Sequence, residues 1–333
     1  MKKVSVIGGG AWGTTLAQVL DDNGYETLVY EINDSYVKRI NEDHLHPIFN
    51  NKLNNKIKAT NSLKDAIDFS NIYLLAVPTK VMRQVVKNIN NNLNKPALFI
   101  NVSKGFEEST FKRVSQIVTE EITPEYNRGF VCLTGPSHAE EVIDRKLTLL
   151  VSASDSRDLA EEVQVMFAND EYMRIYTSCD LIGSEVGGAV KNAIAVISGA
   201  CAGIGLGENA RAAVITRGIL EIIKTVEMMG GNRETVFGLT GIGDLIVTAS
   251  SENSRNFQGG KKLGQGLTVE EIYENATQTI EGFRTIYALQ ELSVKNNVEL
   301  PMINTAYEIL ENRLTIEEGM KRLLKRDLKA EDF

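Results

Sequence analysis

The stretch from Val186 to Leu206 most constrains the fold, because it carries a single charged side chain, Lys191. Wrapped at about 100° per residue, its apolar side chains cover most sides, which predicts a helix that is buried nearly all round. The face of Lys191 is different, since only small residues flank it there: Ser184, Gly187, Gly188, Ala195 and Ser198. A glycine costs a helix about 1 kcal/mol relative to alanine, so we expect this face to meet another group at close range.

Three interpretations of Lys191 compete. The stretch is long enough to span a membrane, but Lys191 and Asn192 near its middle argue against a span. A core helix whose lysine extends to the surface is the simplest structural explanation. We favour a catalytic lysine in a cleft floored by small residues, where desolvation lowers the pKa of the amine unless an anion or a carboxylate meets it.

Length and charge limit the classes of protein that remain. The chain has 333 residues, which is enough for two domains with sizeable cores. Its net charge is −8 and it has no long run of lysine or arginine, so we expect no nucleic-acid partner. The N-terminus leads directly into a strand pattern without a secretory signal, which indicates a cytoplasmic protein.

Cysteine and histidine positions bear on redox state and metal binding. The cysteines are widely spaced and indicate free thiols in a reducing cytoplasm: Cys132, Cys179 and Cys201. His44 and His46 lie in an expected loop, and His138 is far along the chain. We therefore expect no metal site.

The N-terminus carries a glycine motif in a defined context. An apolar strand pattern from Val4 to Ile7 is followed by Gly8-Gly9-Gly10-Ala11-Trp12-Gly13 and then by a helical pattern. This matches G-x-G-x-x-G at Gly8, Gly10 and Gly13, which is typical of dinucleotide binding between a strand and a helix. Gly8 would make the tight turn, Gly10 would admit a pyrophosphate at the helix N-terminus, and Gly13 would let helix and strand pack closely. A structural glycine turn without a nucleotide is the alternative.

The second strand pattern, Thr27 to Tyr30, ends at Glu31. An acidic residue at this place binds the adenosine ribose diol in NAD enzymes, and its charge would repel the additional phosphate of NADP. The alternative is a solvated charge at a strand end. Glu31 is therefore a candidate cofactor-binding residue that favours NAD(H) over NADP(H).

Strand and helix patterns continue to alternate up to residue 177. Strands are expected over residues 72–77, 97–102, 130–133, 147–152 and 172–176. Lys104 and Ser137 follow two of them, at the carboxyl ends where open α/β sheets bind ligands. We therefore predict an α/β fold in which a doubly wound, Rossmann-type domain (1–177) precedes an all-helical domain (178–333). Capping boxes begin helices at Thr268 and Thr315.

Two loops of the helical half offer charged groups. Asp244, after Gly241-Ile242-Gly243, supplies a carboxylate able to pair with Lys191. Ser254 is expected to cap a helix whose N–H groups and Arg255 point at an anion. A surface arginine is the alternative for Arg255.

These features favour reduction of a carbonyl group. A nicotinamide cofactor implies hydride transfer, and the alkoxide that forms needs a proton donor close by. A positioned ammonium can stabilise that charge and donate the proton, which contributes about 10² to 10⁴ in rate. Arg255 and Asn256 at a helix start indicate an anionic substrate, most simply a phosphate ester.

Five segments together resemble a known family. They are Gly135-Pro136-Ser137-His138-Ala139-Glu140-Glu141, Gly187-Gly188-Ala189-Val190-Lys191-Asn192, Ile215-Thr216-Arg217-Gly218, Gly243-Asp244-Leu245 and Ser254-Arg255-Asn256. Across almost its whole length the chain resembles the NAD(P)-dependent glycerol-3-phosphate dehydrogenases of the bacterial biosynthetic type. The resemblance implies reduction of dihydroxyacetone phosphate to sn-glycerol 3-phosphate, which feeds phospholipid synthesis.

The resemblance also implies roles for single residues. Lys191 matches the proton donor and acceptor, Lys104 matches a lysine that touches cofactor and substrate, and Asp244 completes the expected catalytic set. Substrate-binding positions are matched by Lys104, Gly135, Ser137, Lys191, Asp244, Ser254, Arg255 and Asn256. Cofactor-binding positions are matched by Trp12, Lys104, Ala139, Arg255 and Glu281.

Some positions depart from the family pattern. Ala11 replaces a usual serine, which removes a hydrogen bond to the pyrophosphate unless the backbone supplies one. Phe49 falls where the family often has an aromatic residue or histidine on the adenosine side, and Thr279 replaces a usual aliphatic residue. Glu31 and Ile32 stand where many members carry arginine or histidine for the 2′-phosphate, which again predicts a preference for NADH.

Other functions stay open on this evidence. A dehydrogenase of the same two-domain type could act on a different hydroxy acid or sugar, although Arg255-Asn256 and the two lysines argue against it. A dinucleotide sensor without activity could keep the fold, although it would have no need for the catalytic residues. The apolar helical half favours a homodimer.

Overall fold

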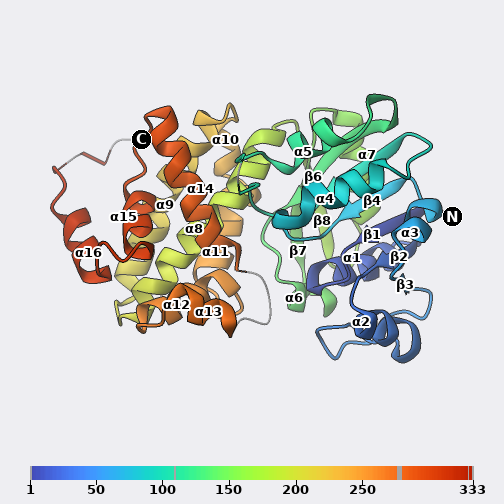
Figure 1. Cartoon of the computed structure of the whole chain (residues 1–333), viewed down its shortest axis with the longest axis horizontal. Helices are drawn as coiled ribbons and strands as arrows, with labels where there is room; N and C mark the ends of the chain where they lie inside the picture. Colours follow the sequence, from blue (N-terminus) through green and yellow to red (C-terminus); the bar gives the residue numbers. More distant parts are fainter. Residues whose placement is uncertain (1, 109, 276–279, 329, 332–333) are drawn as a thin grey trace.

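The chain folds into a sheet part and a helical part that lie side by side. A computed structural model describes residues 2–108, 110–275, 280–328 and 330–331. Figure 1 shows the strands on the N-terminal side of the molecule and the bundle of α8–α16 on the other side. Thr279 lies outside the described residues.

The N-terminal part is built on an eight-stranded sheet with the order β3-β2-β1-β4-β5-β6-β7-β8. The first six strands form the 3-2-1-4-5-6 order of dinucleotide-binding sheets, and all of them pair in parallel. The strands are β1 Lys3–Ile7, β2 Glu26–Tyr30, β3 Lys58–Thr60, β4 Ile72–Leu75, β5 Ala97–Asn101, β6 Asn127–Thr134, β7 Thr148–Ala153 and β8 Met173–Ser178.

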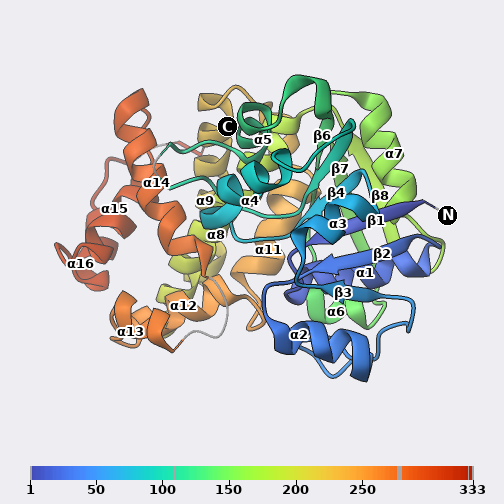
Figure 2. The ribbon, with the colours of Figure 1, turned by 45° about the vertical axis from the view of Figure 1, so that its right-hand side comes forward.

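Helices cover both faces of this sheet. One hydrophobic cluster joins it to α1, α6 and α7, and another joins it to α3, α4 and α5. Figure 2 shows this two-sided covering from a second direction. The helices are α1 Ala11–Asp22, α2 Asp34–Lys38, η1 Arg39–Asp43, α3 Leu63–Phe69, α4 Thr79–Asn90, α5 Val114–Glu121, η2 Pro124–Tyr126, α6 Ala139–Ile143 and α7 Arg157–Phe167.

The strands expected from the sequence are present in the sheet, with two differences. The short strand β3 was not expected, because three residues give too little alternation to detect. β7 pairs antiparallel with β6, whereas the rest of the sheet is parallel. The chain leaves β6 at Thr134, passes through the short α6 and enters β7 opposite the carboxyl end of β6, which reverses the strand direction.

The C-terminal part is helical and is centred on α8, Leu181–Gly203. Asp180 caps this helix by accepting a hydrogen bond from the Gly183 N–H, so it begins before the apolar stretch and ends before Leu206. The helices that follow are α9 Glu208–Met228, α10 Arg233–Val236, η3 Leu239–Gly243, α11 Asp244–Ala249, α12 Arg255–Gly264, α13 Val269–Glu274, α14 Glu281–Asn296, α15 Pro301–Leu310 and α16 Ile316–Leu324.

The prediction that α8 is buried nearly all round is confirmed. Its residues from Gly183 to Val196 are all buried, among side chains of α9, α11, α12 and α14. Within the described part of the chain, α8 alone has the length and composition of a membrane span, but most of it is covered by protein. The capping boxes at Thr268 and Thr315 are both present.

Backbone approach explains the glycines of α8. A Cβ on Gly199 would lie 2.0 Å from the Phe257 carbonyl oxygen, and one on Gly260 would lie 1.9 Å from the Val196 carbonyl oxygen. The main chains of α8 and α12 are therefore in direct contact, which a larger residue at either position would prevent.

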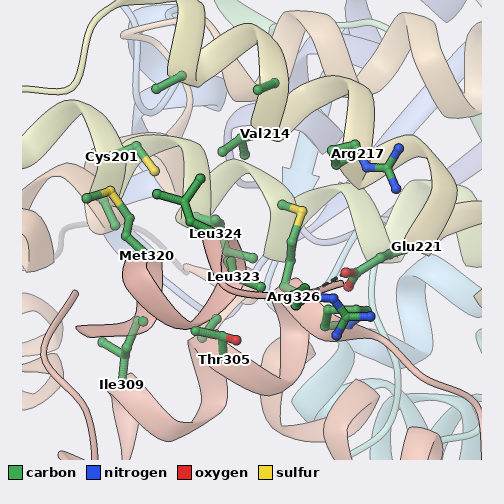
Figure 3. A pocket seen from close by; sticks show the side chains of 18 of the residues that line it. Cys201, Val214, Arg217, Glu221, Thr305, Ile309, Met320, Leu323, Leu324 and Arg326 are labelled. Carbon is green, nitrogen blue, oxygen red and sulfur yellow. Dashed lines mark hydrogen bonds between the residues drawn. The ribbon is translucent and has the colours of Figure 1, made fainter. Parts of the chain in front are cut away.

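An apolar cavity of about 800 Å³ lies on another side of α8 (Figure 3). Cys201 on α8, Val214 on α9, Ile309 on α15 and Met320 on α16 line it. At one end Glu221 accepts hydrogen bonds from the backbone N–H groups of Met302 (2.6 Å) and Ile303 (3.1 Å), and burial raises the pKa of its carboxyl to about 7. None of the expected site residues lines this cavity.

Candidate active site

Lys191 lies in the middle of α8 and is 5% exposed. Its Nζ donates to Asp244 Oδ1 at 2.5 Å and to Thr248 Oγ1 at 2.6 Å. Asp244, the first residue of α11, is 1% exposed. The lysine therefore points inward to a carboxylate, and the interpretation that it extends to solvent is wrong.

Lys104 brings the sheet part to the same carboxylate. It follows β5, and its Nζ donates to Asp244 Oδ2 at 2.6 Å and to the Gly135 carbonyl oxygen at 3.1 Å. The Lys104 side chain is 19% exposed, so it borders on solvent. Asp244 is thus shared by one lysine from each part of the molecule, so the cluster lies at the junction of the two parts.

The electrostatics of this cluster follow from its burial. Burial lowers the pKa of Lys191 to about 7; the Asp244 carboxylate opposes this shift and the Lys104 ammonium adds to it. Burial would raise the pKa of Asp244, but the two ammonium groups outweigh it and hold that pKa below its usual range. Asp244 therefore remains charged at neutral pH, while Lys191 can be either an acid or a base.

The small residues beside Lys191 have the predicted role. A Cβ on Gly187 would lie 3.2 Å from the Thr240 carbonyl oxygen, and one on Gly188 would lie 3.1 Å from Thr134 Oγ1. Both glycines therefore let neighbouring segments approach the lysine face. Thr134 Oγ1 is buried and has no hydrogen-bond partner among the described residues, so it is an additional polar atom beside the cluster.

Sequence reasoning missed Thr248 and the role of Asn192. Thr248 Oγ1 accepts from Lys191 and lies one helical turn after Asp244, a spacing that could have indicated it. Asn192 accepts from Asn256 Nδ2 at 2.9 Å, and Asn256 Oδ1 accepts from the Gly282 N–H at 2.9 Å. This chain links α8, α12 and α14, and no sequence pattern predicts it.

The residues expected to bind the substrate phosphate lie at the start of α12. Ser254 is its N-cap and accepts a hydrogen bond from the Phe257 N–H, as predicted. Arg255 is exposed, and the described residues give it no hydrogen bond or ion pair. Glu281, at the start of α14, accepts from Thr79 Oγ1 at 3.2 Å, and burial raises its pKa.

Gly135 and Ser137 lie at the carboxyl end of β6. Gly135 has a φ of 139°, and a Cβ there would lie 3.1 Å from the Leu149 carbonyl oxygen. Ser137 Oγ donates to the Gly135 carbonyl oxygen at 3.1 Å, beside the Lys104 amine. Ala139 is the first residue of α6.

The glycine motif forms a cradle that fits a dinucleotide pyrophosphate. Gly8 turns the chain with a φ of 112°, and a Cβ on Gly13 would lie 1.9 Å from the Gly8 carbonyl oxygen. Gly10 is the N-cap of α1, and a Cβ there would meet no atom within 4 Å. Ala11 and Trp12 begin the helix, so their N–H groups lie in its first turn, where an anion is stabilised.

Glu31 and Phe49 lie close to this motif. Glu31 Oε2 accepts from the Gly9 N–H at 2.9 Å, so its carboxylate is anchored to the glycine turn rather than free in solvent. Phe49 is partly buried in the loop after η1, with its ring stacked on His46. Cys132, Cys179 and Cys201 are free thiols, and the described residues contain no group that could hold a metal ion.

The parallel sheet, the glycine cradle and the buried lysine between two domains define a dehydrogenase that uses a nicotinamide dinucleotide. Two family models match: the N-terminal part of NAD-dependent glycerol-3-phosphate dehydrogenase over residues 3–160 and its C-terminal part over residues 180–321. The chain belongs to this family of enzymes.

Individual relatives agree with this assignment. The chain is 57% identical to a glycerol-3-phosphate dehydrogenase [NAD(P)+] of Acholeplasma laidlawii, over 99% of both chains, and 48% identical to one of Phytoplasma mali, also over 99% of both. Among solved structures, a glycerol-3-phosphate dehydrogenase of Coxiella burnetii superimposes with a TM-score of 0.91 at 28% identity, covering 98% of this chain and 99% of the other.

Proposed function

We propose that this chain reduces dihydroxyacetone phosphate to sn-glycerol 3-phosphate with a nicotinamide dinucleotide, and that Lys191 supplies the proton. The observation that carries the proposal is the buried Lys191 amine, which shares Asp244 with Lys104 at the junction of the two parts. The direct test is oxidation of NADH or NADPH with dihydroxyacetone phosphate. Turnover only with another hydroxy-acid or sugar precursor would support the alternative dehydrogenase, and dinucleotide binding without turnover would support the sensor.

Each residue of the cluster has a separate task. When bound, the cofactor supplies a hydride to the carbonyl carbon. Lys191 Nζ donates a proton to the carbonyl oxygen as its charge develops. Asp244 orients the amine and limits how far burial lowers its pKa. Lys104 adds a positive charge at the exposed edge of the cluster, where it can contact cofactor and substrate.

The substrate phosphate is assigned to Arg255 and the N-terminus of α12. Arg255 is exposed beside the free N–H groups of this helix, which favours a dianion. Arg255→Ala should raise KM for dihydroxyacetone phosphate at least about tenfold, because charge-assisted hydrogen bonds contribute about 1.5–3 kcal/mol. Lys262→Ala, on the same helix, is the control. An unchanged KM for Arg255→Ala would place the phosphate elsewhere.

The cofactor preference is assigned to Glu31. Its carboxylate lies on the glycine turn, where the additional phosphate of NADPH would meet a negative charge. We expect kcat/KM to be higher with NADH than with NADPH. Glu31→Gln keeps an oxygen for the Gly9 N–H and removes the charge. It should therefore lower the ratio of kcat/KM with NADH to kcat/KM with NADPH. A wild-type preference for NADPH would contradict the assignment.

The proposal also assigns a role to each of the two parts of the chain and a place in the cell. We propose that residues 1–177 bind the dinucleotide and that residues 178–333 complete the substrate site. The product would supply phospholipid synthesis in the cytoplasm, from a homodimer. Support for the two roles comes from the glycine turn of the first part and the Lys191–Asp244 pair of the second, and support for a homodimer comes from exposed apolar side chains of the helical part, among them Phe237, Ile246 and Val294.

A further inference from the structure

The loop between η1 and β3 folds back on itself and buries a histidine. Leu45 and Lys52 form an antiparallel bridge, and the His46 N–H donates to the Asn51 carbonyl oxygen at 2.9 Å. His46 is 0% exposed, although it lies in a loop. It is far from the catalytic cluster in the sequence and takes no part in the proposed reaction.

The hydrogen bonds of the ring define its tautomer. Nδ1 faces the backbone N–H groups of Ile48 (3.2 Å) and Phe49 (3.1 Å), so it accepts from both and carries no proton. The proton is therefore on Nε2, which donates to the Ala11 carbonyl oxygen at 3.1 Å. Burial lowers the pKa of His46 to about 4, with the nearby Arg39 guanidinium contributing, so the ring is neutral at neutral pH.

These contacts fix Phe49 to the first turn of α1. The Phe49 ring stacks on the His46 ring with centroids 4.5 Å apart and an interplanar angle of 22°. From the other side, Arg39 donates from Nε to the His46 carbonyl oxygen at 2.9 Å and from Nη2 to the Phe49 carbonyl oxygen at 3.3 Å. Ala11, which accepts from His46, is the first residue of the helix that follows the glycine turn.

The position in the sheet indicates which half of the dinucleotide is concerned. The loop connects the β2 side to β3, and the order β3-β2-β1 places these strands on the adenosine side of the glycine turn. Stacking of a base on an aromatic ring contributes about 1–3 kcal/mol. We propose that His46 is a positioning residue for the dinucleotide: it holds Phe49 against the start of α1, where Phe49 forms a wall of the adenosine site.

This inference rests on the proposed function, because it needs a dinucleotide at the glycine turn. The test is fluorescence titration of NADH with His46→Asn, Phe49→Ala and the double variant. Asparagine retains an acceptor near Nδ1 but loses the stacked ring and the reach to Ala11. We expect the Kd for NADH to rise about fivefold to tenfold in each single variant, with kcat at saturating substrates within about twofold of wild type. The double variant should be little weaker than Phe49→Ala, since His46 acts through Phe49.

His44→Asn is the matched control. His44 lies in the same loop at a φ of 51°, which asparagine tolerates, and it does not contact Phe49 through any described hydrogen bond or ring contact. Its Kd should stay near the wild-type value. An unchanged Kd for His46→Asn, or single effects that multiply in the double variant, would overturn the proposal. Absence of NADH binding by the wild type would instead overturn the proposed function.

Because His46 is buried, its substitution could lower stability. The melting temperature of each variant without cofactor is therefore measured as well. A His46→Asn protein that loses melting temperature but binds NADH normally would assign the histidine to stability alone. Phe49 is only partly buried, so Phe49→Ala is expected to fold and gives a second, independent measure of the wall.

Discussion

At the scale of single residues, Lys191 combines burial with two close hydrogen-bond acceptors, which leaves one of the three ammonium N–H donors for a substrate oxygen. Two oxygen atoms, from Asp244 and Thr248, accept from an amine whose pKa lies at about 7. Such a group gives up and regains a proton at little cost near neutral pH, which is what a reversible reduction requires. An ordinary surface lysine, with a pKa near 10.4, would return its proton much less readily.

The lowered pKa of Lys191 makes the pH profile a specific prediction. Reduction needs the protonated amine, which is present below the pKa, so kcat/KM for dihydroxyacetone phosphate should fall as pH rises through about 7. Oxidation of glycerol 3-phosphate needs the neutral amine, so kcat/KM for glycerol 3-phosphate should rise as pH rises through the same range. Steady-state rates measured from about pH 5 to about pH 9, roughly two units on either side of this pKa, would show the change in both directions of the reaction.

Lys191→Met gives the companion measurement. If the amine acts in the chemical step as proposed, the substitution should lower kcat by at least about 10²-fold and leave the Kd for the dinucleotide nearly unchanged. A variant with near-normal kcat, or a wild-type profile that is flat through pH 7, would assign Lys191 to packing alone.

At the scale of elements, much of the fold could be predicted and the exceptions have physical causes. The apolar length of α8 and the N-cap serine of α12 are features that indicate helices directly from the sequence. The alternation of strand and helix patterns likewise predicts parallel strands. The three residues of β3 carry too little signal, and the direction of β7 depends on where the chain enters the sheet, which no local pattern records. The pairing of Asp244 with Lys191 could be suggested from the sequence, whereas Lys104 was linked to the site only by its place after a strand and by the family resemblance.

The contacts that sequence reasoning missed are those made between segments without a pattern. The link from Asn192 through Asn256 to Gly282 joins three helices by single side-chain amides. His46 was assigned only to a loop, because the partners of its ring are backbone N–H groups that follow it and, far away in the sequence, the Ala11 carbonyl and the Thr15 hydroxyl. Such hydrogen bonds depend on the folded backbone and not on residue type at a fixed distance along the chain.

The contact between α8 and α12 gives a prediction at this scale. Gly260→Ala would place a methyl group 1.9 Å from the Val196 carbonyl oxygen, so α12 must move away from α8. We expect a loss of about 1–3 kcal/mol in unfolding free energy, as for other overpacked sites. KM for the phosphorylated substrate should rise as well, because Arg255 is on the displaced helix.

Gly207→Ala is the control for this substitution. Nothing lies within 4 Å of a Cβ at Gly207, so only the preference of a helix N-cap is altered, at a cost below about 1 kcal/mol. Urea unfolding and steady-state KM values would check both variants. Equal stability of the two would mean that α8 and α12 can separate freely.

At the scale of the whole molecule, the sheet part and the helical part are joined by the Glu108–Arg284 ion pair (2.9 Å) and by two further ionic contacts that bear on α8. One is the shared Asp244, and the other is Glu185 on α8, which accepts from Arg113 Nη1 at 2.6 Å and from Ser115 Oγ at 2.6 Å. Glu185 is 8% exposed, and burial raises its pKa against the opposing effect of Arg113. Both contacts anchor the N-terminal half of α8, which holds Lys191 in register with the sheet.

Removal of Glu185 should therefore weaken the junction. Glu185→Ala leaves the largely buried Arg113 guanidinium without its carboxylate, and breaking a buried pair in this way costs about 3–5 kcal/mol. Calorimetry should show a lower and broader transition as the two parts unfold less cooperatively. Glu161→Ala, which breaks the exposed pair with Arg157, should change stability by less than about 1 kcal/mol. Equal effects of the two would show that the junction does not depend on Glu185.

The packing of α8 on α12 also bears on how such a sequence can diverge. What holds α8 against α12 is largely the polypeptide main chain, with carbonyl oxygens of Val196 and Phe257 meeting glycines across the interface. Side chains elsewhere in the bundle can be exchanged for others of similar volume without displacing it. An engineer could therefore exchange many apolar side chains of this bundle, provided that these glycines and the polar side chains around Lys191 and Glu185 are left untouched.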